Sequence, residues 1–187
     1  MAAIGWHDWP VTHQPESTPG KLELLLESSW TMAGSGLRSA WPPEHRLGAQ
    51  ALLEFAAGSR FCVLAYLAGA ERLHAIPVSF LMGPDGDFWI PSGGDSVRTR
   101  FLRAHPWAAI VVGPESAPGH RLIRAEGPTS IVAAADLHQS MVPEVRQKLG
   151  QLSWCVSWLL LQPSSLLGWG VPSPPNHSVG RSSRSPG

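Results

Sequence analysis

The strongest constraint on the fold is a series of six short apolar segments, each bounded by turn-forming residues, between residues 44 and 170. Their branched and aromatic side chains are typical of β-strands, and several of the connections are of hairpin length. The predicted strands are residues 60–67, 73–81, 87–91, 107–113, 120–132 and 154–161. Strands and helices do not alternate regularly, as they do in a doubly wound parallel sheet. The sequence therefore predicts a mainly antiparallel β-barrel with short helices, in the α+β class.

Helical segments are expected among these strands, at residues 44–57, 95–104 and 136–149. The first has leucines at helical spacing and stops at Gly58, a residue type that is common at helix C-termini. The second follows Asp95 or Ser96, either of which can cap a helix. Gly127 and Pro128 interrupt the fifth predicted strand, where we expect a β-bulge.

The two ends of the chain differ in composition from this central region. Residues 1–43 contain many prolines, glycines and serines, and only residues 21–30 have the leucine pattern of a short helix. We therefore expect a loosely structured N-terminal extension. Residues 171–187 are dominated by proline, serine and glycine, which predicts a disordered C-terminal tail. The predicted single domain, residues 44–170, is long enough to bury a core.

Charge and hydropathy exclude several classes of protein. The 187-residue chain has 14 basic and 14 acidic residues, whereas proteins that bind nucleic acids or anionic membranes need a basic face. Its apolar runs are much shorter than the ~20 residues that span a bilayer. The first residues lack the basic and apolar regions of a signal peptide, so we expect a cytoplasmic protein. Two cysteines are too few for a disulfide-stabilised scaffold.

Residues 89–103, WIPSGGDSVRTRFLR, have the clearest chemical content. A predicted strand ends, a Ser-Gly-Gly loop follows, and a helix begins with Ser96, Arg98 and Thr99 in its first turn. The first turn of a helix has unpaired N–H groups and a partial positive charge, so these side chains suit a phosphate. The alternative is an ordinary amphipathic helix, with Phe101 in the core and its arginines in solvent.

Three motifs together resemble the FMN-binding split-barrel family, the pyridoxamine 5'-phosphate oxidase-like flavin and deazaflavin oxidoreductases. They are HAIPVSF at residues 74–80, FWIPSGGDSVRTRFLRAHP at 88–106 and AAIVV at 108–112. Each motif is short, and the resemblance depends on their order and spacing over residues 46–169. It implies an antiparallel split β-barrel of the FMN-binding type. It also implies a homodimer in which the second chain completes each site.

The resemblance also implies a set of cofactor-binding positions along one strand, the end of another and the loop before the second helix. These positions are His74, Ala75, Ile76, Pro77, Ser79, Trp89, Ile90, Ser96, Arg98 and Thr99. The implied cofactor is FMN, with the deazaflavin coenzyme F-420 as the alternative, since both have a phosphate on a ribityl chain. The sequence departs from the vitamin B6 oxidases at His74 and Ser79, where those enzymes have basic residues. It also lacks their C-terminal arginine- and histidine-rich motif, so vitamin B6 oxidation is not expected.

The expected function is that of an FMN-dependent oxidoreductase, which transfers hydride to or from a small organic substrate. A deazaflavin-dependent reductase is one alternative, and a non-enzymatic flavin- or haem-binding protein is another. No side chain stands out as a catalytic acid, base or nucleophile, and there is no GxSxG nucleophile elbow. The eight histidines have no HxxH or HxxxH spacing, so no metal site is expected.

Overall fold

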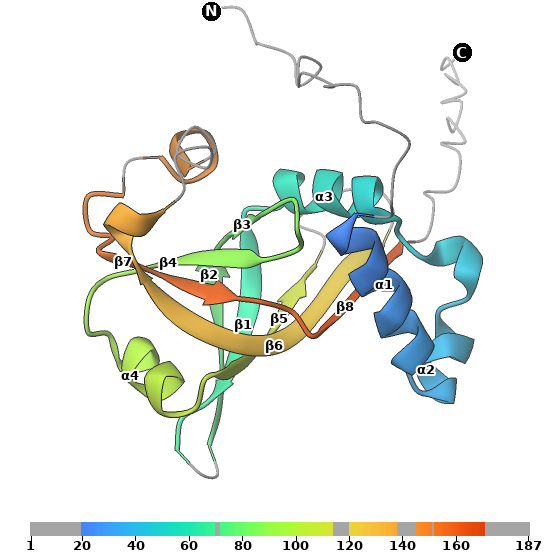
Figure 1. Ribbon diagram of the computed structural model, residues 1–187, viewed down its shortest axis with the longest axis horizontal. Helices are drawn as coiled ribbons and strands as arrows, with labels where there is room; N and C mark the ends of the chain where they lie inside the picture. Colours follow the sequence, from blue (N-terminus) through green and yellow to red (C-terminus); the bar gives the residue numbers. More distant parts are fainter. Residues whose placement is uncertain (1–19, 70–71, 114–119, 138–144, 151, 171–187) are drawn as a thin grey trace, which may run out of the picture.

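A computed structural model describes residues 20–69, 72–113, 120–137, 145–150 and 152–170. Its centre is an eight-stranded antiparallel sheet that curves into a barrel (Figure 1). The strands are β1 (Phe61–Leu67), β2 (Leu73–Ser79), β3 (Leu81–Met82), β4 (Phe88–Ser92), β5 (Trp107–Val112), β6 (Arg121–Ala133), β7 (Ser157–Leu161) and β8 (Ser165–Gly170). They pair in the order β2-β1-β5-β6-β7-β4-β3, and β8 also pairs with β6. The prediction of an antiparallel split barrel with short helices is confirmed.

Short helices lie around this sheet (Figure 1). They are α1 (Lys21–Met32), α2 (Ser35–Ala40), α3 (Ala49–Gly58) and α4 (Val97–Ala104), with 3-10 turns η1 (Pro43–His45) and η2 (Ala134–Asp136) and a π-helical turn η4 (Val145–Leu149). Helix α4 connects β4 to β5 and lies on the opposite side of the barrel from α1 and α2 (Figure 1). No helix in the described part of the chain is long and apolar enough to cross a membrane.

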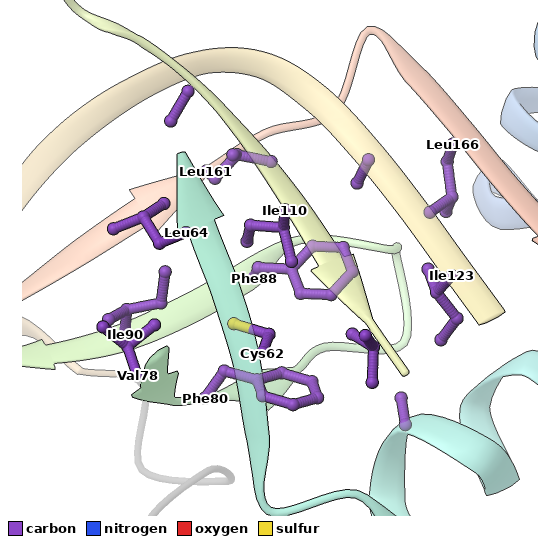
Figure 2. Close-up of a cluster of buried hydrophobic side chains, with 14 of the residues drawn as sticks. Cys62, Leu64, Val78, Phe80, Phe88, Ile90, Ile110, Ile123, Leu161 and Leu166 are labelled. Atoms are coloured by element: carbon purple, nitrogen blue, oxygen red, sulfur yellow. The ribbon is translucent and has the colours of Figure 1, made fainter. Parts of the chain in front are cut away.

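Alternation along the strands decides which side chains form the core. In β1, Cys62, Leu64 and Tyr66 are buried, while the residues between them are exposed or half-exposed. Figure 2 shows Cys62 and Leu64 packed among aliphatic and aromatic side chains of β4, β5, β6 and β8. The other face of β1, β2 and β5, which we call the outer face, has exposed apolar side chains. These are Phe61, Val63, Leu67, Leu73, Trp107 and Val111.

Strand β8 was not among the predicted strands, although it is central to the fold. It contains two glycines and follows Pro163, so its sequence has little of the usual strand signal. The glycines have a packing role, because a Cβ atom on Gly168 would lie 2.7 Å from Leu52 Cδ1 and 3.0 Å from Leu47 Cβ. The last predicted strand begins at Ser157 and not at Trp154, whose side chain is exposed.

Two predicted helices also differ from the structure. The segment 44–57 contains the turn η1 and then α3, which begins only at Ala49 after Gly48. Of the segment 136–149, residues 138–144 lie outside the described residues, and residues 145–149 form the single turn η4.

The predicted bulge at Gly127 and Pro128 is wrong with respect to β5. Pairing of β5 with β6 continues through this point in one register, with Ala108 opposite Gly127 and Trp107 opposite Pro128. On its other edge, β6 changes partner here, from β8 before Gly127 to β7 after Pro128. The two residues therefore mark the place where one strand passes between two halves of the barrel.

Part of the N-terminal extension is packed more firmly than its composition suggests. In α1, Leu22, Leu26 and Trp30 follow one another at intervals of four residues, so they form one stripe. All three side chains are buried, and α1 packs against β8. The expectation of loose structure therefore does not describe α1, whereas α2 has no buried residue. The expectations for residues 1–19 and 171–187 lie outside the described residues.

Candidate functional site

The candidate site is built around the start of α4. Strand β4 ends at Ser92, two glycines follow, and Gly94 has a φ of 49°, which favours glycine over other residues. Ser96 is the N-cap, and its hydroxyl accepts a hydrogen bond from the Thr99 N–H at 3.1 Å. Of the two predicted caps, the structure therefore uses Ser96.

A small hydroxyl network fixes this turn to the end of β4. The Thr99 hydroxyl lies 3.0 Å from the Ser92 hydroxyl and 2.7 Å from the Ser96 hydroxyl. Ser92 and Thr99 are buried, so their hydroxyls are hydrogen-bonded within the protein and shielded from solvent. The network positions the helix start, and the role of Ser96 and Thr99 toward a phosphate remains a prediction.

The Arg98 side chain, in the first turn of α4, contacts the end of β4. Its Nη2 donates a hydrogen bond to the Pro91 carbonyl oxygen at 3.0 Å, while its Nε is buried and has no hydrogen-bond partner. Among the described residues, no carboxylate forms an ion pair with Arg98. Burial lowers the pKa of Arg98, and the nearby Tyr66 and Cys62 side chains act in the opposite direction. A buried, charged donor that lacks its acceptor fits a site for an anion.

Tyr66 is close to this arginine, and His74 lies beside Tyr66. They are opposite each other in the β1–β2 register, and the Tyr66 hydroxyl is 3.5 Å from His74 Nδ1. The His74 ring also meets the Phe101 ring of α4 edge-on, with 6.4 Å between ring centroids. We call Arg98, Tyr66, His74 and Phe101 the Arg98 cluster. Tyr66 was missed in the sequence, although the alternation along β1 and the short hairpin place it opposite His74.

The structure divides the predicted positions on β2 between its two faces. His74 and Ile76 are on the inner face with Val78, whereas Ala75 and Pro77 are exposed on the outer face. Strand β2 is at the edge of the sheet, so Pro77 lies where a missing N–H is tolerated. Ser79 is the partner of Phe61 in the register and lies on the outer face as well.

The side chains of the predicted positions on β4 pack in two apolar clusters. Ile90 is completely buried in the main core (Figure 2). Trp89, on the opposite face of the strand, packs in a second apolar cluster with Leu81 and Trp158. Direct contact of these two side chains with a cofactor stays a prediction. Of the predicted positions, Ser96, Arg98 and Thr99 share the start of α4, and His74 meets the same helix at Phe101.

Nucleophilic and metal chemistry find little support in the described residues. Burial raises the pKa of the Cys62 thiol to about 12, so the thiol is protonated at neutral pH and is not a ready nucleophile. No group of histidine, cysteine and carboxylate side chains in the described ranges is arranged to hold a metal ion. Binding of an anionic ligand is the chemistry that this arrangement supports.

Comparison with known proteins identifies the family. The model of the family described as pyridoxamine 5'-phosphate oxidase matches residues 49–166, which include strands β1 to β7 and the Arg98 cluster. The chain belongs to this family. The family resemblance predicted from the three motifs is therefore confirmed. A comparison with curated protein sequences finds no match.

Solved structures with the same fold include proteins from several bacteria. A FAD-binding protein from Mesorhizobium loti has a TM-score of 0.52 and 14% identity, over 68% of this chain and 97% of that one. General Stress Protein 26 from Bacillus anthracis has a TM-score of 0.51 and 15% identity, over 65% and 92%. A FAD-binding protein from Mycobacterium smegmatis has a TM-score of 0.50 and 11% identity, over 68% and 99%. At these identities the likeness concerns the fold alone.

Proposed function

We propose that this oxidase-family protein binds FMN and is a flavin-dependent oxidoreductase that acts on a small organic substrate. The observation that carries the proposal is the buried, unpartnered Nε of Arg98 at the start of α4. The guanidinium and the free N–H groups of the first helical turn together favour a phosphate group. The FAD-binding names of two proteins with this fold support a flavin over other phosphate-containing ligands.

The residues of this chain would bind and orient the cofactor, which when bound supplies the hydride chemistry. Arg98 would neutralise the phosphate, and the Ser96–Thr99–Ser92 network would keep the helix start in place. His74 would contact the ring system from the edge strand β2. No described side chain of the Arg98 cluster is assigned as a catalytic acid or base.

Titration of the purified apoprotein with FMN, FAD, coenzyme F-420 and haem tests this proposal. We expect FMN to bind in the micromolar range or tighter, with changes in its visible absorption on binding. Tighter binding of coenzyme F-420 would make the protein a deazaflavin-dependent reductase. Binding of haem alone, or of none of the four, would contradict a flavin-dependent function.

We also propose that the protein is a homodimer through its outer face. Val63 is paired with Pro77 on one side and with Val111 on the other, so the exposed apolar side chains of this face are neighbours. Soluble monomers rarely expose a continuous apolar surface of this kind. A second copy would cover this surface, as the family resemblance implies.

A charged substitution at the centre of the outer face tests the dimer. Val63→Glu is expected to convert the protein to a monomer, because the partner would have to bury an unpaired carboxylate. Leu24→Glu is the matched control, since Leu24 is similarly exposed but lies on α1, away from this face. Sedimentation velocity measures both. A wild-type monomer, or a Val63→Glu protein that remains dimeric, would contradict the proposed interface.

A further inference from the structure

The Tyr66–His74 pair has a defined direction, because only one nitrogen of the histidine meets the tyrosine. The hydroxyl of Tyr66 lies 3.5 Å from Nδ1 of His74, at the long end of the hydrogen-bond range. The two rings meet edge-on, with their centroids 5.5 Å apart, and Phe101 contacts the histidine ring from α4. Tyr66 is only 5% exposed, so the pair is held inside the barrel wall while His74 remains partly accessible.

The burial of Tyr66 decides which partner donates this hydrogen bond. Among the described residues, His74 Nδ1 is the one hydrogen-bond partner of the buried Tyr66 hydroxyl. A buried O–H that had no acceptor would carry the full cost of its removal from water. The Tyr66 O–H is then directed to His74 Nδ1, which accepts. A neutral imidazole that accepts at Nδ1 has its proton on Nε2, because the bond made by one nitrogen sets the state of the other.

The Nε2 atom of His74 is available to a ligand. It has no hydrogen bond to any residue in the described part of the chain, and the ring is half-buried on the edge strand β2. It belongs to the same cluster as the unpartnered Nε of Arg98, so the cluster offers two donors without acceptors.

We propose that Tyr66 is a positioning residue, which fixes His74 in its Nε2–H tautomer so that Nε2 donates a hydrogen bond to an acceptor atom of the bound flavin. The inference rests on the proposed function for the identity of the ligand. The state of His74 itself is a property of the chain alone. The two can therefore be tested separately.

The first experiment reads the histidine tautomer in the apoprotein by nitrogen-15 NMR at a pH where His74 is neutral. The signals of His74 are identified among those of the eight histidines by their loss in His74→Gln. We expect the Nε2–H tautomer in the wild type and a mixture of both tautomers in Tyr66→Phe, which removes one oxygen atom. Phe101→Leu is the matched control, because it removes a ring contact of His74 without removing a hydrogen bond, and it should leave the tautomer unchanged.

The second experiment measures FMN affinity by calorimetric titration. Tyr66→Phe should raise the dissociation constant for FMN by about three- to tenfold, which is the effect of one neutral hydrogen bond. His74→Gln should retain most of the affinity, because the glutamine amide nitrogen takes the position of Nε2 and has no tautomers. In the His74→Gln background, adding Tyr66→Phe should have no further effect.

The outcomes distinguish this inference from the proposed function. An Nδ1–H tautomer in the wild type, or an unchanged tautomer in Tyr66→Phe, would overturn the inference even if FMN binds. An equal loss of affinity from Tyr66→Phe in both backgrounds would assign Tyr66 a merely structural role and would also overturn it. Absence of FMN binding to the wild type would overturn the proposed function, and with it the role of His74 toward a flavin.

Discussion

Gly127→Ala is expected to lower the free energy of unfolding by about 3 kcal/mol, the upper part of the range for overpacked sites. A Cβ atom at this position would collide with the Gln162 carbonyl oxygen and would lie 2.8 Å from the Ser164 nitrogen and 3.0 Å from the Pro163 Cα. All three are backbone atoms of the connection between β7 and β8, and they cannot move aside as a flexible side chain would. The strand β6 would have to separate from this connection.

Chemical denaturation of the variant and of the wild type measures this effect. The connection is also held by two backbone hydrogen bonds, from Gln162 N to the Pro128 oxygen and from Ser164 N to the Glu126 oxygen, which the same movement would weaken. Gly58→Ala is the control, because nothing lies within 4 Å of its Cβ position and alanine is favoured in a helix. A Gly127→Ala protein as stable as Gly58→Ala would show that β6 does not pack against the β7–β8 connection as closely as the structure has it.

Most of the barrel could be predicted from the sequence, because its strands have clear local signals. The run from Phe61 to Leu67 is apolar and aromatic, and the hairpin to β2 is short, so both strands and their order were predictable. Strand β8 could not be predicted, because its identity depends on non-local packing. Gly168 is required there by Leu47 and Leu52, residues that are more than a hundred positions earlier in the chain.

The same distinction applies to α1. Its leucine stripe was visible, but the surface that buries it is β8, a strand without a sequence signal. Ser29 makes this dependence explicit, since its buried hydroxyl accepts a hydrogen bond from the Leu166 N–H at 2.8 Å. Once β8 is in place, the helix has both an apolar surface and a polar partner.

The candidate site was predictable where it depends on one continuous segment. The cap at Ser96 and the position of Arg98 in the first turn of α4 follow from residues 89–103 alone. The contact between Phe101 of this helix and His74 depends on how α4 and β2 pack together, which no single segment determines. Trp89 and Ile90 were assigned by their place in a motif, and alternation along β4 directs their side chains into two different apolar clusters.

Arg98→Ala is expected to weaken FMN binding by about ten- to hundredfold. A charge-assisted contact is worth roughly 1.5–3 kcal/mol, and ~1.4 kcal/mol corresponds to a factor of ten in the dissociation constant. The Nε of Arg98 is already desolvated without a partner, so an anion that binds there gains the contact without a large further cost of burial. Isothermal titration of FMN into the apoprotein measures the change, and inorganic phosphate should compete with FMN only while Arg98 is present.

Two variants on the same helix make the result specific to Arg98. Arg103 lies one turn further along, more than half exposed, and its ion pair with Asp95 at 3.3 Å is also exposed, so Arg103→Ala should change FMN affinity little. Ser96→Ala removes the cap and should cost about 1 kcal/mol of stability, with a smaller loss of affinity than Arg98→Ala. Melting temperatures separate a loss of stability from a loss of FMN affinity. Arg98→Ala should lower the melting temperature little, because it loses only one hydrogen bond, to the Pro91 oxygen. An equal loss of FMN affinity in Arg103→Ala and Arg98→Ala would contradict a specific contact between Arg98 and the phosphate. It would mean that the phosphate is attracted by the total positive charge of the helix.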